Sequence, residues 1–328
     1  MTLTNFPNGL SSFGVPVLGG LPIPFTGNYY FVDAISGADG NEGSADSPLA
    51  TLATAYGRCT SGNNDVVFLV GNGLATGTQR ISAQIAWAKN ATHLIGITAP
   101  NGINNRARIS HASTAPATAF TPMVLVTGSG CYFANFSIFE GFAEATAVVT
   151  WEDQGNRNCY SGVSIQGMGN AGFSDDAAGS ADLLLTGGGE HLFQGCTIGL
   201  DTVARGAANA NVRFRSQVAR VTFDNCTFLC DAGAATPLFI DANAANSLNR
   251  WAMFKNCDFL NGLNYGGATV LTAAVSFSAS QNGTIFLNKC SKAGTTDWTA
   301  TDTGTVRLGN MPATSGDTGG EYVTSDAT

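Results

Sequence analysis

The feature that most constrains the fold of this chain is a short phrase that returns along it. Six frames have the form apolar, any, Asn or Gly, apolar, any, and then an apolar or small residue. They are LIGITA from Leu94, FANFSI from Phe133, YSGVSI from Tyr160, FQGCTI from Phe193, FDNCTF from Phe223 and FKNCDF from Phe254, and a degraded seventh, FLNKCS, begins at Phe286. From residue 133 onward, subtracting the start numbers gives separations of 27, 33, 30, 31 and 32 residues. A repeat of this length is typical of folds built from stacked units.

The third position of each frame predicts a bend. Side chains alternate between the faces of a straight strand, so positions 1 and 4 would point to opposite sides, yet both are apolar in all six frames. A residue in the left-handed region would reset this alternation, and Gly and Asn enter that region most easily. The expected corner residues are Gly96, Asn135, Gly162, Gly195, Asn225 and Asn256.

Each frame therefore predicts a strand, a corner and a second strand, which suits one coil of a parallel β-solenoid. Coils stacked about 4.8 Å apart would align their fourth positions in an interior column. The predicted column consists of Phe136, Val163, Cys196, Cys226 and Cys257. We expect the stretches between frames to project as loops, namely 110–127, 141–157, 166–190 and 232–250.

Composition argues against several functional classes. The net charge is −8 and the 15 basic residues are scattered singly, so we expect no nucleic acid partner and no anionic membrane partner. No run reaches the roughly 18 to 20 apolar residues that span a bilayer, and the first residues lack the pattern of a cleaved secretion signal. We expect a soluble protein whose eight cysteines are free thiols in a reducing compartment.

An N-terminal cap is predicted over residues 29–65, because the open end of a solenoid invites edge-to-edge pairing. Within it, SPLATLATAYGRC (residues 47–59) predicts a short helix with Ser47 as N-cap and Pro48 as the first helical residue. The residues expected on its apolar face are Leu49, Leu52, Ala53 and Tyr56.

The same region resembles a known opening. YYFVDAISGADGNEGSADSPLATLATA (residues 29–55), followed by NDVVFLVGNG, is similar to the start of right-handed parallel β-helix proteins of the pectate-lyase-like superfamily. There, a Val-Asp, Gly-x-Asp, Asn-x-Gly and Pro-x-x-Thr series leads into a capping helix. The resemblance implies an all-β, single-stranded right-handed parallel β-helix over residues 66–290. It implies no particular activity, since the superfamily includes lyases, hydrolases, tailspikes and virion proteins without enzymatic function.

Two extensions flank the predicted β-helix. Residues 291–328 are polar, whereas residues 1–28 form an apolar, Pro- and Gly-rich arm. Exposed on a monomer, such an arm would be a solubility liability, so we expect it to contact a neighbouring subunit. This combination of arm and β-helix resembles structural proteins of tailed bacteriophages. The predicted contact residues of the arm are Phe6, Phe13, Val15, Val17, Leu18, Leu21, Ile23 and Phe25.

The candidates for catalysis are sparse. Asp201 and Asp231 each fall eight residues after position 1 of a frame, so they would stack about 5 Å apart, near the separation of a retaining glycosidase pair. The simpler interpretation is two surface acids at the end of a strand. His191 is interpreted as a hydrogen-bonded core histidine rather than a catalyst.

Acidic groups could also bind Ca²⁺, which prefers several oxygen ligands. Glu152 with Asp153, and Asp175 with Asp176, are expected in loops, where solvated acids are the simpler interpretation. A third acidic group in the cap is equally compatible with tight turns, and it contains Asp33, Asp39, Asn41 and Asp46. We predict no metal and no cofactor.

The functional prediction is a non-enzymatic virion protein, namely a capsid decoration or cement protein assembled in the host cytoplasm. Its expected partners are the major capsid protein and sister subunits, as a homotrimer implied by the phage resemblance. The alternative is a tail fibre or tailspike component that binds or cleaves surface polysaccharide, with Trp151, Trp251 and Trp298 as candidates for a sugar groove. A free polysaccharide lyase or hydrolase is a third possibility.

Overall fold

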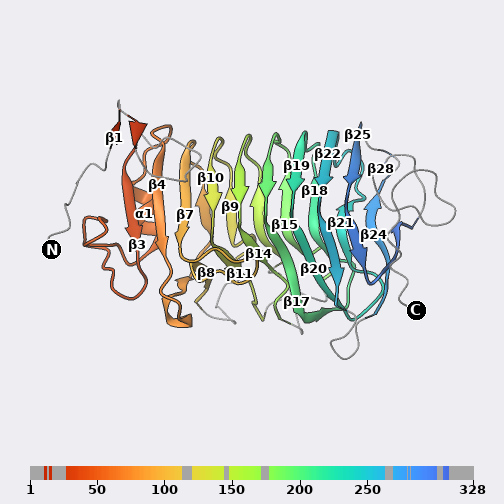
Figure 1. The fold of residues 1–328 in the computed structure, drawn as a ribbon, viewed down its shortest axis with the longest axis horizontal. Helices are drawn as coiled ribbons and strands as arrows, with labels where there is room; N and C mark the ends of the chain where they lie inside the picture. The colour runs from red at the N-terminus through yellow and green to blue at the C-terminus, as the bar shows by residue number, and fades with distance from the viewer. Residues whose placement is uncertain are drawn as a thin grey trace.

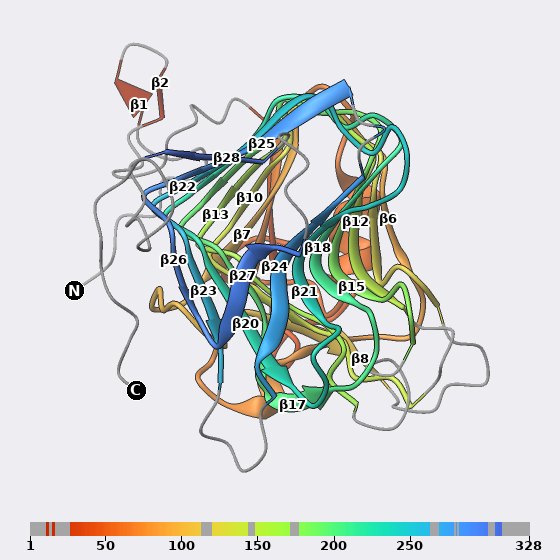
Figure 2. The same ribbon diagram turned by 90° about the vertical axis from the view of Figure 1, so that its right-hand side faces the viewer.

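The chain winds into a rod of stacked coils. The computed structural model describes residues 27–112, 120–143, 148–170, 177–262, 269–278, 280, 282–300 and 306–309, together with the backbone of 11–12 and 15–16. Strands of successive coils lie side by side along the rod (Figure 1). Viewed from the end of the rod, three sheets enclose a common core (Figure 2). The predicted all-β parallel β-helix is confirmed.

Each complete coil contributes one strand to each of three parallel sheets, here called I, II and III, because strands pair with the next coil rather than with their neighbours in sequence. Sheet I contains β3 (Tyr29–Val32), β4 (Asp65–Val70), β7 (Thr92–Ile97), β10 (Tyr132–Ala134), β13 (Cys159–Ser161), β16 (Leu192–Gln194), β19 (Val221–Asp224), β22 (Asn249–Lys255), β25 (Asn282–Asn288) and β28 (Val306–Gly309). Sheet II contains β5 (Gln79–Ile81), β8 (Arg108–His111), β11 (Ser137–Phe139), β14 (Ser164–Gln166), β17 (Thr197–Arg205), β20 (Thr227–Ala232), β23 (Asp258–Asn261) and β26 (Ser291–Ala293). Sheet III contains β6 (Ile85–Trp87), β9 (Val124–Val126), β12 (Val149–Asp153), β15 (Ala181–Thr186), β18 (Ala210–Arg215), β21 (Leu238–Ala242), β24 (Leu271–Phe277) and β27 (Thr295–Thr299). A 3-10 turn, η1 (Ala75–Gly77), and a separate hairpin of β1 (Ser11–Ser12) and β2 (Val15–Pro16) complete the described strands and turns.

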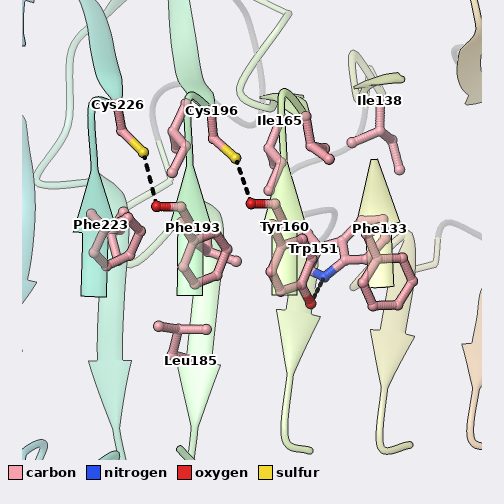
Figure 3. Packing of buried hydrophobic residues seen from close by; sticks show 14 of the residues in the cluster. Phe133, Ile138, Trp151, Tyr160, Ile165, Leu185, Phe193, Cys196, Phe223 and Cys226 are labelled. Atoms are coloured by element: carbon pink, nitrogen blue, oxygen red, sulfur yellow. Dashed lines mark hydrogen bonds between the residues drawn. The ribbon is translucent and has the colours of Figure 1, made fainter. Parts of the chain in front are cut away.

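The first position of each frame builds an aromatic ladder inside sheet I. The rings of Tyr160, Phe193, Phe223 and Phe254 stack in sequence, with centroid separations of 4.4, 4.5 and 4.6 Å. Parallel pairing in register places identical frame positions one above the other, so each ring meets its counterpart at the coil spacing. Figure 3 shows part of this ladder beside the residues of the opposite sheets.

The fourth position forms the interior column that the repeat predicts. All five of its residues are buried in the main core. The thiol of Cys226 donates to the carbonyl of Phe193 in the preceding coil at 3.5 Å, and Cys257 does the same to Phe223 (Figure 3 shows the first). A cysteine thus fills a narrow slot and also satisfies its weak donor. All eight cysteines are free thiols.

Five of the six predicted corner residues have left-handed backbone. Asn135, Gly162, Gly195, Asn225 and Asn256 have φ between 51° and 60°. The sixth prediction, Gly96, is wrong, because β7 runs straight through this residue to Ile97. Its coil turns later, over residues 98–107. Gly96 has another role, since a Cβ there would lie 1.9 Å from the carbonyl oxygen of Asn135.

The seventh frame is displaced by one residue from its predicted start. Leu287, not Phe286, pairs with Phe254 and points inward. The corner is Lys289, with φ 52°, and Cys290 fills the interior slot. Asn288, the third residue counted from Phe286, is therefore the residue before the corner. The β-helix also continues past the predicted boundary at residue 290, since β26, β27 and β28 lie beyond it.

The stretches predicted as projecting loops contain the strands of sheet III. Residues 141–157 include β12, which carries Glu152 and Asp153, so the prediction that these two acids lie in a loop is wrong. Residues 166–190 likewise include β15. These strands lack the corner motif that identified the other two sheets, and their apolar residues alternate over only five or six positions.

The capping helix is present but begins later than predicted. Helix α1 spans Leu52–Arg58, and its N-cap is Thr51, whose side chain accepts from the amide of Thr54. Ser47 instead closes a turn with Ser44. Asp39 explains the shift, since its carboxylate accepts from the amides of Ala50 and Thr51 and holds this segment non-helical. On the helix, Leu52 and Ala55 are buried, whereas the predicted Ala53 is exposed.

The segment before α1 covers the outer edge of sheet I. The amide of Phe31 donates to the carbonyl of Gly43, and the amide of Leu49 donates to the carbonyl of Phe31. This pairing occupies the free edge of β3, as an end cap must. No helix within the described residues is long and apolar enough to span a membrane.

Candidate functional site: the carboxylate cluster between sheets II and III

A polar cluster lies at the corner where sheet II passes into sheet III. Asp182 on β15 accepts from the amide of Gly167 at 2.6 Å and from Asn211 Nδ2 at 3.0 Å. Arg205, at the end of β17, donates to Asn211 Oδ1 at 3.2 Å and lies 3.9 Å from the Asp182 carboxylate. Asp182 and Asn211 are fully buried, and Arg205 is 2% exposed. The cluster is thus an Asp182–Arg205 charge pair in which the side-chain amide of Asn211 is hydrogen-bonded to both partners.

Local sequence explains how these groups meet. Asp182 and Asn211 each directly precede an inward-facing residue, Leu183 and Val212, which pair with each other across the sheet. The alternation of a strand then turns both polar side chains outward to the same corner. Arg205 reaches them because β17 carries three extra residues, 201–203, between its pairing positions with β20.

The pKa values of two carboxyl groups at this corner, Asp182 and Asp231, are raised. Burial raises the pKa of Asp182 to about 7, against the opposing charge of Arg205. Burial also raises the pKa of Asp231, and the negative charge of Asp201 raises it further while Arg205 lowers it. A carboxyl that holds its proton near neutral pH is the property a general acid requires.

The structure places Asp201 and Asp231 in this corner but out of register. Asp231 lies opposite Ala204, because the irregularity in β17 displaces Asp201 from the ladder. Asp201 and Asp231 occupy equivalent positions in their frames, but they do not lie one above the other in the structure. Asp231 is 7% exposed and lies beside Arg205 and Cys230, while Asp201 is half-buried. Asp201 is thus the carboxyl of this corner nearest to the surface, and Asp231 is more exposed than the fully buried Asp182.

A second network of buried polar groups, around Asp153, stabilises the core. The carboxylate of Asp153 accepts from Tyr160 Oη at 2.7 Å, from Asn158 Nδ2 and from the amide of Gly155. His191 Nδ1 accepts from the Asn158 amide at 3.4 Å, and burial lowers the pKa of this histidine, so the ring is neutral. Every group lies inside the solenoid. This agrees with the prediction that His191 is a hydrogen-bonded core residue.

The other candidate residues are distributed over the rod. In the cap, Asp33 accepts from the amides of Ile35 and Ser36, and Asn41 donates to the carbonyl of Pro48, so both serve turns. Asp175 and Asp176 lie outside the described residues. Among the described residues, no group of three or more His, Cys, Asp or Glu side chains could hold a metal ion.

The tryptophans form no common groove. Trp151 is fully buried and its indole N–H donates to Tyr160 Oη. Trp298 packs edge-on against Phe259 in the last coils, and Trp251 is half-buried on β22 of sheet I. The predicted arm residues lie outside the described residues, except that the backbone of Val15 belongs to β2.

Sequence reasoning missed Asp182, Arg205 and Asn211. The available signal was a polar residue directly before an apolar alternation in two successive coils, Asp-Leu-Leu-Leu and Asn-Val-Arg-Phe. That signal becomes readable once the strands of sheet III are known.

Several solved structures are similar to this chain. The chain is similar to the pectin methylesterase of Aspergillus niger, with 15% identity and a TM-score of 0.47, over 91% of this chain and 88% of the other. The pectin methylesterase PemA of Erwinia chrysanthemi has 12% identity and a TM-score of 0.47, over 85% and 92% of the two chains. A rhamnogalacturonan lyase has 15% identity and a TM-score of 0.43, over 79% and 74%.

The fold of this chain is a parallel β-helix, as its three parallel sheets show. The expected resemblance is thus confirmed at the level of the fold. The prediction that this chain is not an enzyme is contradicted by these neighbours, which bear the names of enzymes, and it is withdrawn. No model of a protein family matches the chain, and no curated protein matches it.

Proposed function

We propose that this chain is a structural protein of a tailed-phage virion, namely a decoration protein that stabilises the head. In this proposal the arm of residues 1–28 and the β-helix body contact the major capsid protein and sister subunits, in a homotrimer. The site of action is the assembled particle, which forms in the host cytoplasm.

The observation that carries the proposal is an apolar cluster on the outside of the rod. Val66, Ile95 and Tyr132 alternate with core residues on β4, β7 and β10, so they point away from the interior of the solenoid. Tyr29 and Phe68 extend the cluster, and their ring centroids lie 6.0 Å apart. Val66, Ile95 and Tyr132 are only 0 to 6% exposed, so this outer face is covered rather than open to solvent. It supports the proposal because sheet I packs apolar groups on its outside as well as in its core.

The stacked core supports the proposal that the body is a rigid structural element. The ladder of rings and the column of thiols run through successive coils without interruption. Each coil is stabilised mainly by its neighbours, as in other repeat proteins. Such a rod is suited to a particle that must remain intact outside a cell.

The test is quantitative mass spectrometry of purified particles, which measures copies of this chain per major capsid subunit. We expect a ratio of the order set by the shell lattice, and we expect deletion of residues 1–28 to abolish attachment while the body stays folded. A handful of copies per particle would place the chain in the tail, and absence from particles would refute the proposal.

A second candidate function is binding or cleavage of a surface polysaccharide by a tail component. The carboxylate cluster favours it, because Asp231 combines a raised pKa with a position beside Arg205 near the surface. In this candidate Asp231 donates a proton to the glycosidic oxygen as the bond between that oxygen and the sugar carbon breaks. A water molecule adds to the sugar carbon and returns a proton to Asp231, and Arg205 stabilises the negative charge that Asp231 carries in between.

Turnover of host capsular polysaccharide would test this candidate. Asp231→Asn should abolish release of reducing ends, while Asp224→Asn, a surface acid on sheet I, should leave it unchanged. Equal activity of the two variants, or none in the unmodified protein, would remove this candidate.

A further inference from the structure

A row of outward side chains runs along the second half of sheet I. It contains Leu192, Thr222, Met253 and Phe286, which pair in register across β16, β19, β22 and β25. Each of them directly precedes a buried core residue, as Met253 precedes Phe254, so the alternation of the strand turns it outward. Strands β22 and β25 lie side by side toward the blue end of the rod (Figure 1). The row is therefore largely apolar on the outside of the solenoid.

This outer row is covered in the first coils and open in the later ones. Tyr132 belongs to the same row, since it pairs with Cys159 and Cys159 pairs with Leu192. Tyr132 is 6% exposed, whereas Leu192 and Phe286 are 37% and 36% exposed. Large apolar side chains that lie open in one line favour contact with another polypeptide.

A groove of about 450 Å³ lies at the open end of this row. Its apolar lining includes Met253, Phe286 and Leu308, and its polar lining includes Thr284 and Arg307. Among the described residues that line it, Arg307 is the one cation and no carboxylate is present. The groove is thus suited to an apolar occupant with little or no charge.

The size of the open face favours a peptide segment over a second rod. Leu192 and Phe286 are three strand spacings apart, about 14 Å. A stable contact between two globular bodies buries about 800 Å² on each side, which corresponds to a patch roughly 28 Å across. An extended segment of about five residues spans the same 14 Å as the open row.

The N-terminal arm has the chemistry of this occupant. Residues 1–28 contain no Asp, Glu, Lys or Arg, and their large side chains include Phe6, Phe13 and Phe25. The other terminal segment, residues 310–328, carries three carboxylates and no basic side chain. One arginine cannot pair with three carboxylates, and burial of an unpaired charge is costly. The groove therefore favours the arm over the C-terminal segment.

A second copy of the chain is favoured as the source of the arm. Leu192 and Phe286 are open to solvent in a single subunit, although that subunit includes its own residues 1–28. The arm joins the body at β3, at the opposite end of sheet I from β28. A fully extended segment of 28 residues spans about 90 Å, so an arm can reach the groove of a neighbouring rod.

We propose that the outer face of sheet I from β16 to β28 is the docking groove for the apolar arm of a second copy of this chain. This inference rests on the proposed function, in which the arm contacts sister subunits, and it names the surface that the arm occupies. Contact of the arm with Met253 and Phe286 removes apolar surface of both chains from water. Each subunit gives one arm and receives another, which is a head-to-tail contact that closes into a ring such as a trimer.

Photo-crosslinking of the full-length protein tests the proposal. Benzoylphenylalanine replaces Phe286, and in a control variant it replaces Leu260, which is 38% exposed on β23 of sheet II. Denaturing gels distinguish crosslinks between chains, which double the mass, from crosslinks within one chain, and mass spectrometry identifies the joined peptides. We expect position 286 to be joined to residues 1–28 of a second chain, and position 260 to give no such product.

Light scattering of the full-length protein provides a second readout. Met253→Glu places a charge in the groove and should weaken association of the subunits about tenfold or more. Leu260→Glu adds the same charge outside the groove and should leave the mass of the oligomer unchanged. Far-UV circular dichroism checks that both variants keep their β-structure, and the crosslink at position 286 decides the matter if Met253→Glu does not fold.

Several results would overturn the proposal. They are crosslinks from position 286 to the arm of the same chain, to residues 310–328 or to the β-helix body, a monomeric unmodified protein, and equal association of Met253→Glu and Leu260→Glu. These measurements use purified protein without capsid, whereas the virion proposal is tested by copy number in particles. Failure of the one is therefore distinguishable from failure of the other.

Discussion

Phe223 and Phe254 lie one coil apart with their rings 4.6 Å between centroids and 3° from parallel. Phe223 is stacked on its other side by Phe193, so both of its faces are in contact. Phe223→Ala should therefore lower the free energy of unfolding by about 3–5 kcal/mol, through lost contacts and a cavity that flanking rings fill poorly. Chemical denaturation would measure the change.

The matched control is Phe286→Ala on β25 of the same sheet. Phe286 faces outward and is 36% exposed, so its removal should cost about 1 kcal/mol or less. Similar losses for the two variants would contradict the ladder as the source of stability.

Asn225 turns the chain from sheet I to sheet II at φ 56°. Asn225→Val should lower the free energy of unfolding by about 1–3 kcal/mol, because a β-branched residue is strained in the left-handed region. Asn225→Gly should be close to neutral, as glycine occupies the same corner at Gly162 and Gly195. Thr222→Val on the adjacent straight strand is the control, and a cost equal to that of Asn225→Val would show that backbone strain is not the cause.

Because of His93, the free energy of unfolding should decrease as the pH falls. Its Nδ1 accepts from the amide of Tyr132 at 3.0 Å, and burial lowers the pKa of the ring to about 4. The unfolded chain protonates near pH 6.5. The contribution of His93 is therefore present above about pH 6.5 and is lost as pH falls toward 4, by up to about 3 kcal/mol. Denaturation between pH 8 and 4 should show this loss in the unmodified protein and not in His93→Gln, whose amide can accept the same bond. Parallel curves would refute the assignment.

The Asp182 carboxyl should make the free energy of unfolding fall as the pH rises, over a pH range that overlaps that of His93. Burial raises its folded pKa to about 7, while the unfolded carboxyl titrates near 3.9. The folded protein thus holds a proton that the unfolded chain has released, so the contribution is fully present below about pH 4 and is lost as pH rises through 7.

The stability difference between the unmodified protein and Asp182→Asn isolates this carboxyl from His93 and other groups. We expect that difference to shrink by a few kcal/mol between about pH 4 and pH 7 and to be constant above it. A difference that is flat with pH would show that Asp182 keeps the same charge in both states.

The repeat alone was sufficient to predict the coils and most of their corners. The chain turns at Asn225 and Asn256, and the next residues, Cys226 and Cys257, point inward. This turn is a local property, because a left-handed residue resets the side-chain alternation whatever lies elsewhere in the chain. Two features can be read from a few consecutive residues, namely the backbone preference of the corner residue and the apolar periodicity on either side of it. The fold class and the interior column therefore follow from local rules.

Local rules also mark where sequence reasoning failed. Gly96 matches the corner pattern, but the carbonyl of Asn135 in the next coil requires a glycine there for close approach, without a bend. Lys289 turns a corner with a residue type that the pattern did not admit, because the flanking ladder of Leu287 and Cys290 imposes the position. In both cases contacts between coils override the preference of the residue.

The carboxylate cluster and the register of sheet II were decided by tertiary structure. Asp182 and Arg205 are 23 positions apart by subtraction, and the irregularity of β17 determines whether they meet. Arg80 and Gln166 lie on the same face because three successive strand pairings hold one register. The sequence by itself determined a solenoid with turns at Asn and Gly, since these depend on local backbone energy. Charge pairing and unsatisfied polar groups depend on which side chains stacking brings together and on which of them it removes from water.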